Sequence, residues 1–373
     1  MRVLVWQWGR RGGAPRFAAS LAAGFNALDD VVALLSLSTG AEILHGPEAP
    51  ACALPVATYR GIASLLWRAL LAPLMIHRLT VALRRLRPDL AVCAQPGPLD
   101  LLMIAALRRV GVQAAVIVHD ATPHPGDGVP LEFALQRALI RRSDPVIVLS
   151  EHVAAGLRAQ GVVRPGVALI VAAHPPVDFN VSAPTGAHDG PRRLLIFGRL
   201  LAYKGLDLLV GALQLLGPRP DMTVRVVGEG PESATLSALR ALPGVTVENA
   251  WVPESEVGAL LSWSDILVLP YREASQSGVA AAAIAAGRRV VATRVGGLVG
   301  QLGNEKRATL CAPEAAALAA AIRTAVDLAG EAAAPPANAN EGWRHLAQLV
   351  LEAMAPTSLP LPMAEVGARK RSG

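Results

Sequence analysis

Two cations, Arg199 and Lys204, lie in a turn of the chain that begins at Gly198. An apolar run at 194–197 precedes the turn and a helical pattern at 206–216 follows it, so the order is strand, turn, helix. The first N–H groups of a helix are unpaired, and its N-terminus is electropositive. Beside two fixed cations, such a helix start is a site for a doubly charged anion such as a diphosphate. An ordinary surface turn with solvated cations is the alternative.

The elements that must position these cations alternate between strand and helix along most of the chain. Apolar runs without alternation are typical of parallel strands covered on both faces, and the alternation predicts an α/β fold with two Rossmann-like, doubly wound halves. Strands are predicted at 3–6, 31–37, 90–94, 114–118 and 146–149, and then at 194–197, 223–227, 245–248, 266–269 and 289–292. Helices in the first half are predicted at 16–28, 99–109, 131–141 and 151–160.

A polar, turn-rich segment at 181–191 is the predicted linker between the halves. It divides the chain into an N-terminal domain, 1–180, and a C-terminal domain, 192–340. The length of 373 residues agrees with two domains. The tail, 355–373, is rich in Pro and then in Lys and Arg, and is predicted to be disordered.

The composition favours some kinds of binding partner over others. The net charge is +6, which suits anionic substrates or an anionic membrane surface, whereas the aromatic and basic interleaving of a single-strand nucleic-acid binder is missing. The three cysteines lack metal-binding spacing, so reduced thiols and no metal site are expected. Neither a secretory leader nor a run of ~20 uncharged apolar residues is visible, so a cytoplasmic protein is expected.

Further motifs follow the cationic turn in a fixed order. They are Val-Val-Gly-Glu-Gly-Pro-Glu at 226–232, Val-Glu-Asn-Ala-Trp-Val-Pro at 247–253, Ser264-Asp265 before a strand, Ala-Ser-Gln-Ser-Gly-Val at 274–279, and Val-Gly-Gly-Leu at 295–298. This order resembles the retaining glycosyltransferases of family four, which have the GT-B fold of two Rossmann-like domains facing a cleft. The resemblance covers 190–303 and, less closely, the first half.

The resemblance implies transfer of a sugar, with retention, from a nucleotide-sugar donor to a saccharide or lipid-linked acceptor. It implies that Arg199 and Lys204 bind the donor diphosphate, where fixed cations stabilise the charge of the leaving group. It implies same-face attack without a cofactor or metal, and a helix at 341–354 that crosses back to the first half. The donor-binding residues that it implies are Gly12, Gly13, Gly198, Glu229, Ser275, Gln276, Ser277, Gly278 and Val279.

The first half offers its own candidates. His119 ends a predicted parallel strand, where ligands of such sheets bind, and the resemblance places it near the donor sugar. Asp120 either orients His119 or is a candidate acceptor base, while His124, between prolines, is predicted at the surface, and His174 in a rigid turn. The Gly12–Gly13 pair either allows close approach to a ligand or forms a plain tight turn.

The chain departs from the family at two glutamates that usually flank 275–279. Counting back from Gly287 places them at Ala274 and Ala282, and a one-residue slip places them at Ser275 and Ala283. Neither pair contains a carboxylate, and Glu273 is near the first position without filling it. The departure puts in doubt the donor nucleotide and full activity. Ser275 and Ser277 are also candidate helix caps.

Three alternatives stay open. The segment 63–87, with Trp67 and five arginines, could lie on an anionic bilayer, although two packed helices broken at Pro73 are favoured. A nucleotide-sugar epimerase shares the expected architecture. A non-catalytic protein that binds sugar nucleotides would explain the missing glutamates.

Overall fold

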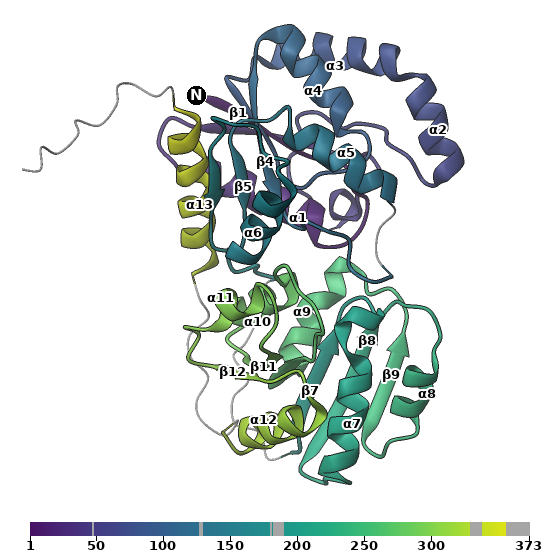
Figure 1. Ribbon diagram of the computed structural model, residues 1–373. Helices are drawn as coiled ribbons and strands as arrows, with labels where there is room; N and C mark the ends of the chain where they lie inside the picture. Colours follow the sequence, from purple (N-terminus) through teal and green to yellow (C-terminus); the bar gives the residue numbers. More distant parts are fainter. Residues whose placement is uncertain (47, 127–129, 180, 182–189, 329–337, 356–373) are drawn as a thin grey trace, which may run out of the picture.

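The computed structural model describes residues 1–46, 48–126, 130–179, 181, 190–328 and 338–355. Each half of the chain forms one six-stranded parallel sheet flanked by helices, and Figure 1 shows the two halves stacked one above the other. The α/β class and the two doubly wound halves predicted from the sequence are therefore confirmed. Most of the predicted linker and the tail beyond residue 355 lie outside the described residues.

The first sheet has the strand order β2-β1-β3-β4-β5-β6. Its order switches between β1 and β3, which is the position where doubly wound sheets open a crevice for ligands. The strands are β1 (Arg2–Gln7), β2 (Val32–Leu37), β3 (Leu90–Cys93), β4 (Gln113–Val118), β5 (Val146–Val148) and β6 (Leu169–Val171). The helices are α1 (Gly13–Asn26), the 3-10 helix η1 (Glu42–His45), α2 (Ile62–Leu70), α3 (Ala72–Leu86), α4 (Asp100–Val110), α5 (Pro130–Ile140) and α6 (Glu151–Gln160).

The second sheet has the order β12-β11-β10-β7-β8-β9, with its switch between β7 and β10. Leu194 in β7 pairs with Val224 on one side and with Ile266 on the other. The strands are β7 (Arg192–Phe197), β8 (Met222–Gly228), β9 (Val245–Asn249), β10 (Ile266–Leu269), β11 (Arg289–Thr293) and β12 (Ala308–Cys311). The helices are η2 (Ala202–Lys204), α7 (Leu206–Leu216), α8 (Ala234–Arg240), α9 (Glu254–Trp263), α10 (Gly278–Ala285), α11 (Leu298–Leu302) and α12 (Ala315–Leu328).

Each sheet has a packed core on both faces, because successive side chains of a strand point to opposite sides. In β1, Leu4 and Trp6 belong to one core and Val3 and Val5 to the other. In the second sheet, Leu194 of β7 belongs to one core and Leu195 to the core on the other face. Burial on both faces explains why the central strands read as continuous apolar runs.

The last described helix, α13 (Ala339–Met354), returns to the N-terminal domain. Trp343 is buried in a core of that domain and donates a hydrogen bond from Nε1 to the carbonyl oxygen of Pro176, at 2.8 Å. A Cβ atom on Gly24 of α1 would lie 2.4 Å from the Trp343 carbonyl oxygen, so only glycine allows this close approach. Figure 1 shows α13 alongside the upper domain.

The segment 63–87 forms two helices, with Pro73 in the first turn of α3, as the sequence favours. The axes of α2 and α3 are bent by 72° at the break. Within the described residues, no single helix is long and apolar enough to cross a membrane, and only this bent pair passes by length and composition when taken together.

Candidate active site

A cleft of about 500 Å³ separates the two halves. Most of its lining comes from the loops that follow β1 and β4 in the first sheet and β7, β8, β9 and β10 in the second. All the residues that the sequence singled out for donor, catalytic and acceptor roles line it except Ser275. Those in the lining are Gly12, Gly13, His119, Asp120, Gly198, Arg199, Lys204, Glu229, Gln276, Ser277, Gly278 and Val279.

The two cations of the β7–α7 turn are held by tyrosines. The Lys204 ammonium lies 3.8 Å from the ring centroid of Tyr271 and 4.9 Å from that of Tyr203, and Arg199 donates from Nη2 to the Tyr203 hydroxyl at 3.1 Å. Burial lowers the pKa of Lys204, while contact with Tyr203 opposes this effect. Both cations are therefore fixed at the cleft by aromatic side chains that sequence reasoning missed.

Glycines let the β7 and β8 loops approach each other closely. Gly198 has φ 114° and Gly228 has φ 148°, both in the region that favours glycine. A Cβ atom on Gly228 would lie 1.8 Å from the Gly198 carbonyl oxygen. The N–H of Gly198 bonds the carbonyl of Val227, so the two loops form one unit at the cleft.

The start of α10 faces the cleft from the other side of the switch point. Ser277 is its N-cap, and its hydroxyl accepts from the N–H of Ala280 at 3.2 Å. The Ser277 N–H donates to the Gln301 side chain at 2.9 Å, so it is not available to a ligand. The N–H groups of Gly278 and Val279 begin the helix and have no acceptor within it.

Gln276 lines the cleft and has a buried acceptor atom in its side chain. Among the described residues, its Oε1 atom is buried and has no hydrogen-bond partner. A buried amide oxygen without a donor is costly in a folded protein. The position therefore suits a ligand that brings a hydroxyl or N–H group.

His119 is buried at the end of β4. Its Nε2 lies 2.9 Å from the Ala94 carbonyl oxygen, which can only accept, so Nε2 carries the proton and Nδ1 remains an acceptor. Burial lowers the pKa of His119 despite the charge of Asp120, which raises it. Phe17 packs edge-on against the ring, with centroids 4.7 Å apart. A neutral imidazole thus lines the cleft.

The sequence predicted His124 at the surface, but it lies between the two domains. Its side chain is 12% exposed and stacks on Tyr203 with ring centroids 4.6 Å apart. Its Nε2 lies 3.2 Å from Oδ1 of Asp120, and its Nδ1 lies 3.5 Å from Oε2 of Glu273. The reason for the error is that Tyr203 and Glu273 are distant in sequence.

Asp120 bonds His124 rather than orienting His119, whose ring is held by Ala94. Burial alone would raise the pKa of Asp120, but hydrogen bonds from His124 and Ser275 and the charges of two histidines lower it instead. His174 also lines the cleft, and burial together with His119 lowers its pKa to about 4. The interpretation of His174 as a rigid turn alone is thus incomplete.

A second group of contacts joins the domains at the α9 side of the cleft. Arg16 of α1 pairs with Glu254 of α9, with Nε and Oε1 2.5 Å apart. Glu42 accepts from Trp251 Nε1 at 3.2 Å and from the Glu254 N–H at 2.8 Å. None of these residues was predicted. Trp251 and Glu254 follow β9, and the rule that strand ends face the crevice could have indicated them.

The two positions where the sequence lacks the expected glutamates can now be located. Ala274 and Ala282 line the cleft and are 3% and 2% exposed, whereas the slipped pair, Ser275 and Ala283, is outside the lining. The ungapped count therefore gives the cleft-facing positions. Glu273 does not replace either glutamate, because it points to His124 and is 55% exposed.

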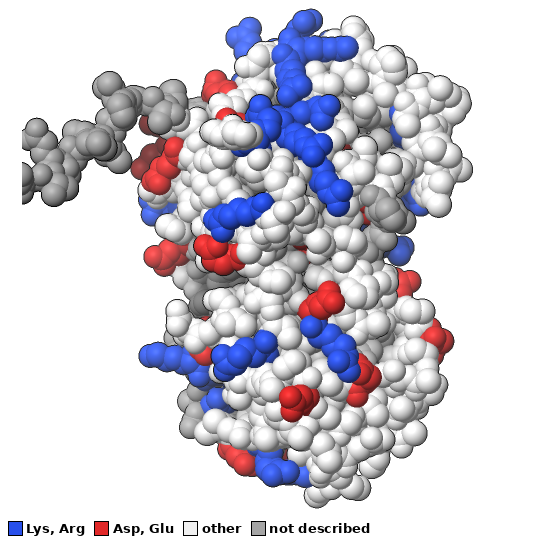
Figure 2. Space-filling view, in the orientation of Figure 1, with Lys and Arg blue, Asp and Glu red and all other residues white. Residues whose placement is uncertain are grey.

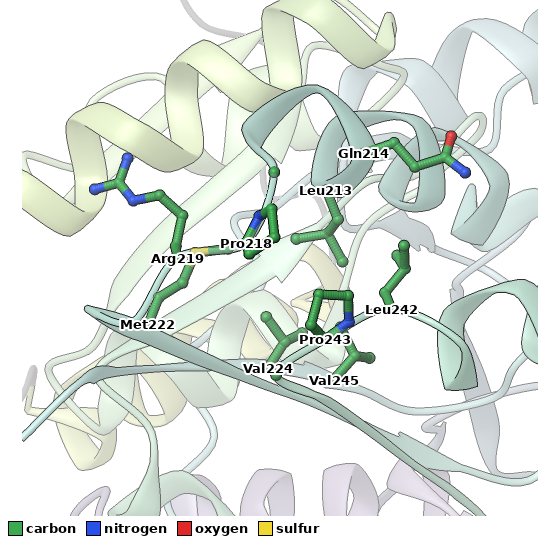
Figure 3. Close-up of a pocket in the computed structure, with 11 residues that line it drawn as sticks. Leu213, Gln214, Pro218, Arg219, Met222, Val224, Leu242, Pro243 and Val245 are labelled. Carbon is green, nitrogen blue, oxygen red and sulfur yellow. The ribbon is translucent and has the colours of Figure 1, made fainter.

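A smaller hollow of about 230 Å³ lies at the start of β8 and β9, the end of the sheet away from the cleft. Figure 3 shows mainly apolar side chains around it, including Leu213, Met222 and Val245, with Arg219 and Gln214 at its margin. It contains none of the predicted site residues. Ligands of doubly wound sheets bind at the carboxyl ends of strands, so the cleft is the candidate site.

Comparison with known families gives two matches that cover most of the described chain. Residues 12–173 match a family described as glycosyl transferase 4-like domain, and residues 191–327 match one described as glycosyl transferases group 1. The 2-deoxystreptamine glucosyltransferase of Streptomyces kanamyceticus is 31% identical over 274 residues, which cover 66% of this chain and 70% of that protein. The glycogen synthase of Mycobacterium tuberculosis is 33% identical over 207 residues, 52% of this chain and 48% of its own length.

Solved structures share the architecture. Anabaena HepE, in complex with UDP and glucose, has a TM-score of 0.66 and 17% identity, with 95% of this chain and 97% of that chain covered. The UDP-GlcNAc 2-epimerase of Neisseria meningitidis, bound to UDP-GlcNAc, has a TM-score of 0.60 and 12% identity, with 95% and 99% covered. At these identities the likeness concerns the fold.

Proposed function

Because the chain belongs to the GT-B glycosyltransferases of family four, we propose that it transfers a hexosyl group from a nucleotide sugar to a hydroxyl group of a saccharide or lipid-linked acceptor, with retention of configuration. The observation that carries this proposal is the placement of Arg199 and Lys204 on the cleft, opposite the start of α10. Tyr203 and Tyr271 hold both cations in place. Fixed positive charge at a helix start is what a diphosphate requires.

The cations act on the leaving group. As the bond between the sugar and the diphosphate breaks, negative charge grows on the diphosphate oxygen, and Arg199 and Lys204 stabilise it without reorganising. The N–H groups of Gly278 and Val279 add donors with the same polarity. The glycines of the β7 and β8 loops let backbone approach the donor closely.

Two acceptors suit the hydroxyl groups of the donor. Neutral His119 has its Nε2 proton engaged by Ala94, which leaves Nδ1 to accept from a sugar hydroxyl. Gln276 Oε1, buried without a protein partner among the described residues, suits a second hydroxyl. Hydrogen bonds of this kind orient the anomeric carbon towards the acceptor side of the cleft.

Retention is proposed to proceed by same-face attack. A covalent intermediate needs a carboxylate beside the anomeric carbon. The family's glutamate positions hold Ala274 and Ala282, and Asp120 is engaged by His124. The departing diphosphate is then the base nearest to the acceptor, and it takes the hydroxyl proton as the new bond forms.

The test is transfer by Arg199→Ala and Lys204→Ala. Each variant should lose about 10²-fold or more in kcat, the scale for one group that stabilises developing charge. Lys306→Ala is the matched control, because Lys306 is exposed and outside the cleft lining. Near-normal turnover in both cleft variants would overturn the proposal.

A nucleotide-sugar epimerase is the second candidate, supported by the shared fold of the Neisseria meningitidis enzyme. An epimerase converts its sugar nucleotide without an acceptor. New sugar nucleotide formed from the donor alone would favour this reaction, whereas strict dependence on an acceptor would favour transfer. Donor binding with neither reaction would favour a non-catalytic protein.

A further inference from the structure

Helix α2 lies on the N-terminal domain with almost no burial of its own. None of its nine residues is buried. Leu65 is the α2 side chain that packs, partly buried, against a core of the N-terminal domain. The bend of 72° at the break with α3 turns α2 away from the direction of the longer helix. Figure 1 shows α2 at the outer edge of the upper domain. Its outer face therefore has no partner within the described chain.

That face is apolar. The exposed fractions are 79% for Ile62, 65% for Leu66, 59% for Trp67 and 71% for Leu70, and Leu74 in the first turn of α3 is 44% exposed. Residues 62, 66 and 70 recur every four positions, which places them in one row along the helix. We call these five residues the α2 surface. Large apolar side chains gathered in this way mark an interaction site.

The charge carried by α2 and α3 themselves has one sign, although Glu132 of α5 lies near Tyr59, just before α2. Residues 60–87 contain six arginines and no Asp or Glu. Figure 2 shows an uncharged area over α2 and Lys and Arg side chains over the neighbouring upper part of the domain. The six arginines of residues 60–87 are Arg60, Arg68, Arg78, Arg84, Arg85 and Arg87.

From this combination we propose that the α2 surface docks on a lipid bilayer with anionic headgroups. Apolar side chains with Trp enter the boundary between headgroups and acyl chains, while arginines beside them bind the headgroup phosphates. A second copy of the chain is a poorer occupant, because the arginines of α2 and α3 would face the same arginines of the other copy and these two helices carry no carboxylate. The inference does not rest on the proposed function, since docking is measured without turnover.

The test is flotation of the full chain with vesicles of phosphatidylcholine alone and with phosphatidylglycerol added. The wild type should float with the anionic vesicles and release as salt rises, because the charge attraction is screened. The double variant Leu66→Gln/Leu70→Gln should lower the bound fraction at least tenfold. The matched control is Leu215→Gln, since Leu215 on α7 is 61% exposed on the other domain, and it should bind as the wild type does.

Thermal unfolding of each variant checks that the fold is kept, as expected for exposed positions. Failure of the wild type to float, or equal flotation of the double variant, would overturn the proposal. So would a concentration-dependent dimer, seen by sedimentation velocity without lipid, that the double variant abolishes. The proposal is supported if the double variant loses docking on vesicles while its donor binding is unchanged. This result does not depend on whether Arg199→Ala or Lys204→Ala lowers transfer.

Discussion

At the scale of single residues, the most revealing environment is that of Lys204. Its ammonium group packs against two aromatic rings instead of a carboxylate. Aromatic faces hold a cation without neutralising it. Lys204 can therefore remain fixed and still offer its charge to a ligand, whereas an ion pair with Asp or Glu would compete with that ligand.

A second buried group, Asp100, makes stability depend on pH. Its carboxyl accepts from the Gly97 N–H at 2.6 Å and from Trp6 Nε1 at 3.2 Å, and it contacts Cys93. Burial raises its pKa from 3.8 to about 7, although these hydrogen bonds oppose the shift. The folded state thus favours the neutral acid. Protonated Asp100 therefore stabilises the folded state. Its contribution is complete below the unfolded pKa and is lost as pH rises through about 7.

Asp100→Asn should remove this dependence. The free energy of unfolding of the wild type, relative to the variant, should fall by on the order of 4 kcal/mol between pH 4 and pH 8, because each tenfold difference in proton affinity is worth about 1.4 kcal/mol. Denaturant unfolding at several pH values measures it. Asp327→Asn, at an exposed position, is the control. Parallel profiles for the wild type and Asp100→Asn would contradict the assignment.

The sequence predicted cleft residues that directly follow strands. It did not predict residues whose position at the cleft depends on contacts with residues far away in the sequence. His119 could be predicted because a strand end faces the crevice wherever the neighbouring strands run. The contacts of His124 could not, because Ser275 and Glu273 are about 150 residues away and meet it only when the domains assemble. The tyrosines that hold Lys204 were also missed, since aromatic residues usually indicate core.

At the scale of elements, the central strands and the edge strands β2 and β9 could be predicted from the sequence, whereas the edge strands β6 and β12 could not. Strands such as β10 are fully buried and read as apolar runs. The strands β6 and β12 are short, lie at sheet edges and are only partly buried, so they give no such run. The α2–α3 break was expected from Pro73, but the exposure of α2 depends on tertiary packing and was not.

The turn after β8 offers a prediction about local structure. In Gly228→Ala, the new Cβ would meet the Gly198 carbonyl oxygen at 1.8 Å, with φ at 148°. Both loops would have to move, so the free energy of unfolding should fall by more than about 1 kcal/mol. Transfer should fall as well, because Gly198 precedes Arg199. Thermal or denaturant unfolding and a transfer assay measure the two effects.

The control for this change is Gly300→Ala in α11, where a Cβ meets nothing within 4 Å. Alanine favours a helix interior over glycine by about 0.5–1 kcal/mol, so this variant should be slightly more stable. Equal stability of Gly228→Ala and the wild type would show that the two loops are not packed as described.

At the scale of the whole molecule, the domains are joined by polar contacts around the cleft, by the packing of Ala281 of α10 into a core of the N-terminal domain, and by α13. On one side, Arg16 and Glu42 contact the start of α9. On the other, His124 contacts Tyr203 and Glu273. Polar contacts of this kind suit domains that open and close around a ligand, because they exchange readily with water.

The His124 contact should make the closed arrangement depend on pH. The hydrogen bond to Asp120 raises the pKa of His124 above 6.5, and Glu273 adds to the effect, while burial opposes it. Asp120 belongs to the same domain as His124, so only the contribution of Glu273 depends on contact between the domains, and it favours that contact while His124 is protonated, at pH values below 6.5. That contribution is lost as pH rises through the raised value.

His124→Gln should abolish this dependence. The wild type should be more compact at pH 5.5 than at pH 8, and the variant should match the wild type at pH 8 under both conditions. Small-angle scattering of the ligand-free protein measures the radius of gyration. His345→Gln, an exposed histidine on α13, should keep the wild-type response. If His124→Gln still contracts at pH 5.5, another group controls closure, because the imidazolium between Asp120 and Glu273 would then be dispensable.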